Sequence, residues 1–350
     1  MTEWKTYRLG DIATMKYGKL PPKNNKGKYP IWSGYRNVGL TDTYNCGKGT
    51  IIVVARGVGG TGDVKIAKED CFLTNLSIAV NLDVNICNPQ FFYYKFLLSN
   101  LKYLDSGSAQ SQITIDDLKR LQLSLPSLEE QRRIAGILGA IDDKIENNRR
   151  INTNLELQAQ ALYKQWFVDN RNDDWETLML DDVATLSAGG DKPQVCSDKK
   201  TPDCKIPIYS NGIDDEGLYG YTNNPRIKEN SITISARGTI GFVCLRTEPY
   251  VPIVRLISIV PTRENISAYF LYLWALTQNI SGTGTTQQQL TVPAFRTTKI
   301  VVPSQNVLIK FNQVVKPIFD SIKQNKKENE TLATLRDTLL PKLMNGEIKM

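Results

Sequence analysis

Residues 126–166 read PSLEEQRRIAGILGAIDDKIENNRRINTNLELQAQALYKQW. From Ile134 to Trp166, apolar residues recur at alternating spacings of four and three, with asparagine at two of the positions. This spacing is the heptad pattern of a long helix that packs against another helix. Ser127 and Glu130 form the Ser-x-x-Glu pattern of a capping box, which predicts that the helix begins here. A long, partnered helix is therefore expected at the centre of the fold.

The segment 304–350 repeats this helix at an offset of 177 positions, which pairs Asn148 with Asn325 and Asn152 with Asn329. Buried amides bond best to one another, so these four asparagines are predicted to set the register of the two helices. The alternative is that they lie where the helices fray or face solvent. The apolar contact positions predicted for the second helix are Phe311, Val315, Ile318, Ile322, Leu332, Leu335 and Leu339.

The globular parts of the chain repeat as well. Ala55-Arg56-Gly57 matches Ala236-Arg237-Gly238, and Gln112-Ile113-Thr114 matches Gln289-Leu290-Thr291. Short β-branched runs and short apolar helices predict an α+β fold with two similar mixed α/β domains, arranged as a pseudo-two-fold pair. The predicted divisions are a first domain at 1–126, a central helix at 127–170, a second domain at 171–303 and a C-terminal helix at 304–350.

The composition excludes several kinds of enzyme. The 350 residues contain no histidine, so a Ser-His-Asp triad, a Cys-His pair and histidine-ligated zinc are ruled out. The six cysteines form no Cys-x-x-Cys pair, so no metal site is predicted. Scattered thiols without a secretion signal fit a reducing cytoplasm, and no apolar run is long enough to cross a membrane.

Two short motifs resemble enzyme signatures but have simpler explanations. Residues 57–62 match Gly-x-Gly-x-x-Gly, yet the sequence that follows alternates like a strand, so a glycine-rich hairpin turn is the better interpretation. Residues 88–91 resemble the Asn-Pro-Pro-Phe motif of amino-methyltransferases, but Asn88 as helix N-cap and Pro89 at the first helical position explain them without catalysis. No catalytic residue is predicted.

The stretch 125–138, Leu-Pro-Ser-Leu-Glu-Glu-Gln-Arg-Arg-Ile-Ala-Gly-Ile-Leu, resembles the conserved region of type I restriction–modification specificity subunits. The pattern Trp-x-x-x-x-Leu-Gly/Asp-Asp-Ile/Val-Ala, which opens each half at Trp4 and Trp175, is similar to that family too. The resemblance covers the whole chain in the order recognition domain, helix, recognition domain, helix. It implies two target recognition domains and an antiparallel coiled coil that acts as a spacer.

The resemblance also implies function and partners. Subunits of this kind are non-catalytic: they bind double-stranded DNA and dock two methyltransferase subunits, which translocating restriction subunits can join. S-adenosylmethionine and ATP are then expected on the partners, with no cofactor on this chain. Two different recognition domains joined by a spacer should bind an asymmetric, two-part DNA site. Its half-sites should lie about one helical turn, ~34 Å, apart.

Charge and repeat divergence predict which residues contact DNA. Residues 1–126 carry 16 Lys and Arg against 10 Asp and Glu, whereas residues 171–303 carry 13 against 14. Residues shared by the two halves are expected to hold the DNA backbone, and divergent loops to read bases. The shared candidates are Arg56, Gln110, Gln112, Arg237, Gln287 and Gln289. The divergent candidates are Lys16, Lys19, Lys23, Lys26, Lys28, Tyr35, Arg36 and Asn37 in the first half, and Lys192, Lys199, Lys200, Asn211, Asn223, Asn224 and Arg226 in the second.

Several alternatives stay open. The shared residues could serve only turns and structural hydrogen bonds, and any single divergent residue could be a solvated surface side chain. The chain could instead be a self-contained DNA methyltransferase or nuclease, a specificity subunit of a type IIB-like system, or a helical scaffold that binds only protein.

Overall fold

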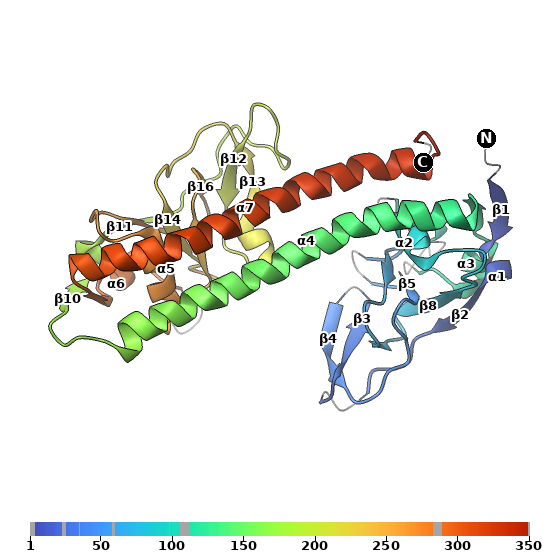
Figure 1. Ribbon diagram of the computed structural model, residues 1–350, viewed down its shortest axis with the longest axis horizontal. Coiled ribbons are helices and arrows are strands. Elements are labelled where there is room, and N and C mark those ends of the chain that lie inside the picture. The colour runs from blue at the N-terminus through green and yellow to red at the C-terminus, as the bar shows by residue number, and fades with distance from the viewer. Residues whose placement is uncertain are drawn as a thin grey trace. The chain divides into compact units, whose positions relative to one another are not determined.

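The computed structural model describes residues 4–22, 26–34, 36–57, 60–97, 99–105, 112–282 and 289–348. The chain forms two compact units, residues 1–147 with 328–350 and residues 148–327, and each is described by itself. The long helices α4 (Leu128–Tyr163) and α7 (Gln305–Met344) contribute residues to both units (Figure 1). In the described part of the chain, none of the helices has the length and apolar character that a membrane span requires.

Three small sheets make up most of the first unit. A four-stranded sheet has the order β2-β8-β5-β6, a three-stranded sheet the order β4-β3-β7, and β1 pairs with β9. The strands are β1 (Lys5–Arg8), β2 (Ala13–Tyr17), β3 (Tyr29–Ser33), β4 (Arg36–Thr41), β5 (Ile51–Val54), β6 (Val64–Ile66), β7 (Phe72–Leu73), β8 (Ser77–Leu82) and β9 (Gln122–Leu125). The short helices are α1 (Leu9–Ile12), α2 (Pro89–Leu97), η1 (Lys102–Leu104) and α3 (Ile115–Arg120).

The core of the first unit joins these sheets to the long helices. All four residues of β5 are buried, as an apolar run in the interior of a sheet should be. Phe91 of α2 packs into the same core as Leu138 of α4 and Leu340 of α7. Full burial of each such side chain contributes about 1.5–3 kcal/mol. The Asn88 side chain caps α2 by accepting a hydrogen bond from the Phe91 N–H at 3.0 Å, which confirms the capping interpretation.

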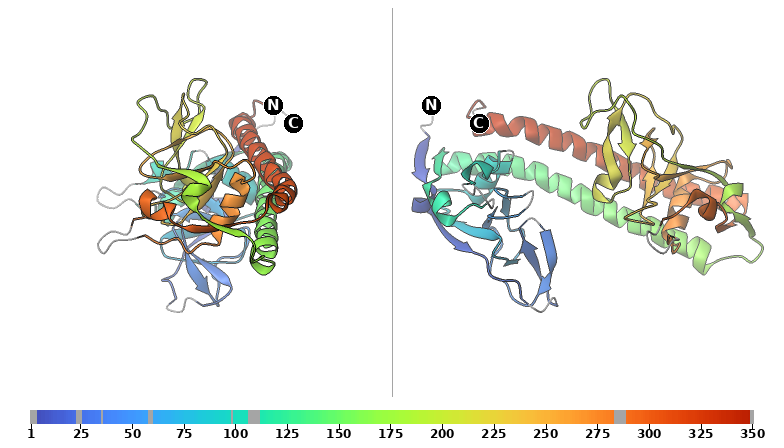
Figure 2. Two further views of the ribbon diagram at one scale, coloured as in Figure 1. Left: turned by 90° about the vertical axis from the view of Figure 1, so that its left-hand side faces the viewer. Right: turned by 180° about the vertical axis from the view of Figure 1, so that it is seen from behind.

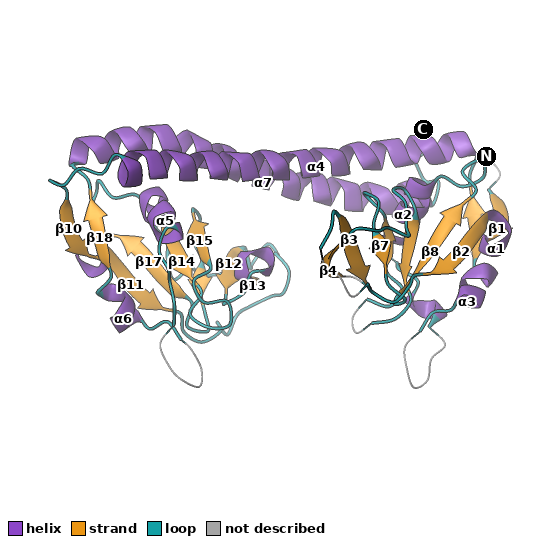
Figure 3. Ribbon diagram, turned by 90° about the horizontal axis from the view of Figure 1, so that it is seen from below, coloured by secondary structure: helices purple, strands orange, loops and turns teal. Residues whose placement is uncertain are grey.

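The second unit repeats this topology. Its sheets have the orders β11-β17-β14-β15, β13-β12-β16 and β10-β18, the same arrangement as in the first unit (Figure 3). The strands are β10 (Glu176–Met179), β11 (Ala184–Ala188), β12 (Ile206–Tyr209), β13 (Leu218–Thr222), β14 (Ser231–Ile234), β15 (Val243–Arg246), β16 (Val251–Pro252), β17 (Ile257–Pro261) and β18 (Lys299–Val302). The shorter helices are η2 (Lys164–Asp169), η3 (Leu180–Asp182), η4 (Asp214–Gly217), α5 (Ala268–Leu276) and α6 (Val292–Arg296). The internal repeat and the mixed α/β class are confirmed.

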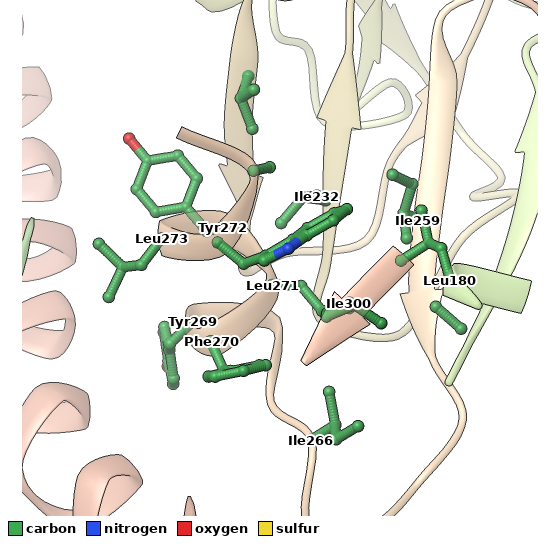
Figure 4. Packing of buried hydrophobic residues seen from close by; sticks show 14 of the residues in the cluster. Leu180, Ile232, Ile259, Ile266, Tyr269, Phe270, Leu271, Tyr272, Leu273 and Ile300 are labelled. Carbon is green, nitrogen blue, oxygen red and sulfur yellow. The ribbon is translucent and has the colours of Figure 1, made fainter. Parts of the chain in front are cut away.

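Helix α5 is the centre of the second core. Residues 268–275 are all buried, so the helix has no solvent-facing stripe (Figure 4). One side of it meets strand residues such as Ile232 and Ile259, and Tyr269 stacks on Phe319 of α7 with ring centroids 5.0 Å apart. Tyr272 donates a hydrogen bond to the Glu156 carboxylate of α4. The globular part of this unit is therefore bound to both long helices.

Segments of α4 and α7 run antiparallel within each unit, and Figure 2 shows them side by side. In the first unit, Arg336 pairs with Asp142 at 2.8 Å and Lys144 with Glu328 at 3.4 Å. Residue numbers therefore rise along α4 where they fall along α7, as expected for antiparallel helices.

In the second unit, the Asn325 Nδ2 donates to the Asn152 Oδ1 at 2.8 Å, while Trp166 lies against Phe311. In the first unit, the predicted contact position at Leu335 is wrong, because this residue is 46% exposed. Arg336 takes the inward position there, through its ion pair with Asp142.

Candidate nucleic-acid interface

A strained turn connects β16 and β17 of the second unit. Val254 and Arg255 have φ values of 50° and 61°, in the left-handed region that a β-branched residue such as valine rarely adopts. Each such residue costs on the order of 1–3 kcal/mol, so the surroundings must hold the turn in place.

Two glycines at the end of β11 provide part of that support. The Gly189 and Gly190 carbonyls accept hydrogen bonds from the Arg255 and Val254 amides at 3.3 and 3.0 Å. A Cβ on Gly189 would lie 2.8 Å from the Ile253 carbonyl oxygen, so only glycine allows this approach.

Asn211 provides the rest of the support. Its Nδ2 donates to the Val254 carbonyl at 2.5 Å, and its Oδ1 accepts from the Ala236 amide at 2.8 Å. The side chain thus links the strained turn to the segment that carries Arg237. Asn211 was predicted to read bases, and the structure places it as a brace within the surface.

Two arginines converge on one amide beside the turn. Arg237 donates from Nε and Nη2 to the Gln289 Oε1 at 3.0 and 2.7 Å, and Arg255 donates from Nη1 to the same oxygen at 3.4 Å. Both arginines are exposed, and neither forms an ion pair with a carboxylate among the described residues. A guanidinium carries five N–H donors, so this pair has donors left for an acceptor-rich ligand.

Arg226 extends the same surface. A Cβ on Gly190 would lie 2.8 Å from the Arg226 Nη1, which places this guanidinium over the glycine. Lys192 lies two residues after Gly190 in the sequence, and its ammonium group is 5.1 Å from the centre of the Tyr219 ring. Hydrogen bonds with Cys196 and, to a smaller extent, with Tyr219 raise the pKa of Lys192, so Lys192 remains a cation. The remaining candidates, Lys199, Lys200, Asn223 and Asn224, are exposed on the surface of the second unit.

The first unit has the same scaffold at the matching place. Lys19 bridges to Thr74 as Gly190 bridges to Ile253, and a Cβ on Gly18 would lie 2.1 Å from the Thr74 carbonyl oxygen. Arg56, the counterpart of Arg237, is half-buried, and its Nε has no hydrogen-bond partner among the described residues. A buried, unsatisfied donor of this kind is costly and is the kind of group that a ligand satisfies.

The other first-unit candidates are spread around this scaffold. Lys16 lies on β2, Arg36 and Asn37 lie on β4, and all three are exposed. Lys28 is 4.8 Å above the Tyr29 ring, and Lys26 is exposed. The Gln112 backbone N–H donates a hydrogen bond to the Asp105 Oδ1 at 2.8 Å. Lys23, Tyr35, Gln110 and Gln287 lie outside the described residues.

The predicted helix asparagines fall into two groups. Asn152 and Asn325 contact each other in the second unit, and the Asn152 Nδ2 also lies 3.4 Å from the Ile322 carbonyl oxygen. Asn148 is buried in the second unit, whereas Asn329 is half-buried in the first.

Sequence reasoning missed Arg255 and the glycine pair that holds its turn. Residues 250–256 read as an apolar strand-like run, in which a left-handed valine is not expected. The available signal was Gly189-Gly190, because adjacent glycines at a strand end indicate a close backbone approach. Within the described ranges, no three His, Cys, Asp or Glu residues gather to hold a metal ion.

The two mixed α/β units, completed by antiparallel segments of two long helices, define an internally repeated fold. A crystal structure of the type I restriction-modification system S subunit from M. genitalium shares this fold, with a TM-score of 0.65, 22% sequence identity and coverage of 98% of this chain and 96% of that chain. The family described as type I restriction modification DNA specificity domain matches residues 1–157 and 172–334, and the chain belongs to this family.

Two curated relatives match over most of their length. The type I restriction enzyme MjaIX specificity subunit of Methanocaldococcus jannaschii is 27% identical, over 99% of this chain and 94% of the relative. A putative type I specificity subunit of Mycoplasma pneumoniae is 28% identical, over 86% of this chain and 85% of the relative. The family predicted from residues 125–138 is confirmed.

Proposed function

We propose that the chain is the sequence-specific DNA-binding subunit of a type I restriction–modification enzyme. The observation that carries this proposal is the duplication: the family matches both halves, and each half builds the same glycine-supported turn beside an arginine. This surface occurs twice, and its Arg56 and Arg237 guanidinium groups have no carboxylate partner among the described residues. Such a surface fits a polyanion with acceptor-rich base edges.

We propose that residues 1–126 and 171–303 are the two target recognition domains. Arg56 and Arg237 occupy matching places, so they are assigned to the DNA backbone in both half-sites. The divergent residues around them, such as Lys19 against Gly190, are assigned to base reading. Because the two surfaces differ, the DNA site is asymmetric and has two parts.

The long helices are proposed to be the spacer and the docking surface for two methyltransferase subunits. The spacer segments are 127–170 and 304–350, paired as a coiled coil whose register is set by Asn148, Asn152, Asn325 and Asn329. Leu157 on α4 and Leu335 on α7 are 56% and 46% exposed, so each presents an apolar side chain to a docking partner.

Chemistry is assigned to the partners. The chain is proposed to have no catalytic residue, while S-adenosylmethionine binds the methyltransferase subunits and ATP binds any restriction subunits that join them. The site residues described above supply hydrogen-bond donors and positive charge, which serve recognition.

The test is to map methylated adenines in DNA from cells that express this chain with its methyltransferase. The expected result is methylation at one asymmetric, two-part sequence with a fixed spacer, and no such pattern when this chain is omitted. Methyl transfer by the purified chain alone would contradict the proposal.

A further inference from the structure

The strained turn of the second unit has a feature that its first-unit counterpart lacks. The segments Thr74 to Ser77 and Ile253 to Leu256 have the same length: the Thr74 and Ile253 amides donate to Trp32 and Tyr209, and the Ser77 and Leu256 carbonyls accept from Gly18 and Gly189. The bridges of Lys19 with Thr74 and of Gly190 with Ile253 fix the alignment of the two turns. Arg255 therefore stands where the first unit has Leu76, and neither Asn75 nor Leu76 has the positive φ of Val254 and Arg255.

We propose that Arg255 is a specificity-determining residue that reads a guanine in the second half-site, beside a DNA-backbone contact made by Arg237. This inference rests on the proposed function. It assigns different roles to two guanidinium groups that share one acceptor.

The first argument is that the backbone of this turn is strained and is held in place by specific hydrogen bonds. Two consecutive non-glycine residues, Val254 and Arg255, have positive φ, and Val254 is 56% exposed, so its own burial does not repay the strain. Asn211 and the two glycine carbonyls fix the backbone instead. A side chain on such a pre-organised turn loses little freedom when it binds.

The second argument is the charge arrangement. Arg237 and Arg255 both donate to the Gln289 Oε1, so two cations share a neutral acceptor and no described carboxylate offsets them. Their mutual repulsion is relieved by a ligand that presents several acceptors. Guanine presents O6 and N7 side by side in the major groove, which matches the fork of one guanidinium.

The third argument separates the two arginines. Arg237 has a counterpart in Arg56, as expected for a contact to the DNA backbone that both half-sites need. Arg255 has none. Residues 171–303 also lack a basic excess, so this unit depends less on general attraction to phosphate and more on contacts of defined geometry.

The experiment uses the complete complex of this chain with its methyltransferase and a library of DNA sites with single base changes. Arg255→Lys keeps the charge but removes the bidentate fork. We expect it to lower the preference for guanine at one position of the second half-site by about 10-fold or more, with the salt dependence of binding unchanged. Arg237→Ala should weaken binding to all sites alike and reduce the salt slope by about one.

Arg263→Lys is the matched control. This arginine is exposed in the same unit, but it donates to the Asp182 carbonyl and pairs with Glu176. It should leave base preference unchanged. Unaltered preference in the first half-site shows that each variant complex is folded.

Two results would overturn the inference: an Arg255→Lys complex with unchanged preference at every position, or one that loses affinity uniformly, as a phosphate contact would. A wild-type complex with no sequence preference at all would instead contradict the proposed function, so the two failures are distinguishable.

Discussion

The amide pair between α4 and α7 allows a quantitative test of how the helices are aligned. The Asn325 Nδ2 donates to the Asn152 Oδ1 at 2.8 Å, and both side chains are half-buried. Each asparagine alone can be replaced by leucine, which has a similar branched shape, and the two changes can then be combined.

The expected magnitudes follow from the contacts. Each single change removes a hydrogen bond and leaves a partly desolvated amide, a cost of about 1–3 kcal/mol in the free energy of unfolding. The higher helix propensity of leucine offsets at most about 0.5 kcal/mol of that cost. The double variant Asn152→Leu/Asn325→Leu leaves no orphaned amide and gains an apolar contact, so it should be more stable than either single variant.

The assay is urea unfolding of the full chain. Replacing Trp4 and Trp32 by phenylalanine leaves Trp166, Trp175 and Trp274, all in the second unit, as the fluorescent reporters. We expect a coupling free energy of about 1–2 kcal/mol between the two positions. Effects that add to within about 0.3–0.5 kcal/mol would refute the direct amide contact.

Three further predictions concern other parts of the molecule. The buried Arg246 donates to the Thr233 Oγ1 at 3.0 Å, so Arg246→Met should cost about 2–4 kcal/mol in urea unfolding, and a loss under about 0.5 kcal/mol would contradict this. Burial raises the pKa of Cys87 to about 12 from an ordinary 9.0. The stability that the folded state gains from keeping this thiol protonated is therefore fully present below pH 9 and is lost toward pH 12. Wild-type stability should fall by up to about 1.4 kcal/mol per pH unit relative to Cys87→Ala over that range, and parallel pH profiles would exclude the effect. Leu157→Glu or Leu335→Glu should weaken co-purification of the methyltransferase at least about 10-fold while unfolding is unchanged within about 0.5 kcal/mol, and undiminished co-purification would argue against the proposed docking surface.

Much of the fold could be predicted from the sequence because it depends on local patterns. The heptad spacing predicts α4, and the Ser127 side chain does accept a hydrogen bond from the Glu130 amide at 3.3 Å. The β-branched run 231–234 forms β14, and the apolar run 268–276 forms α5. Periodicity and capping act over a few residues, so they can be read without tertiary structure.

The candidate site could be predicted only in part because it depends on contacts between distant segments. Arg237 and Gln289 were identified from the repeat, but the left-handed Val254 and Arg255 result from three segments that meet in space. The sequence predicts base reading for Asn211 but does not reveal that its side chain braces the turn, because its two hydrogen-bond partners lie far along the chain. Leu335 shows the same limit for the helices, because the sequence alone does not reveal that Arg336 faces Asp142 while Leu335 is exposed.

The most direct test of the central claim replaces residues 1–126 with the corresponding domain of another specificity subunit. Methylated adenines are then mapped in cells that express the hybrid with its methyltransferase. Two independent recognition domains predict a new sequence in one half of the site, with the other half and the spacer length unchanged. An unchanged site, or a change in both halves, would contradict the account.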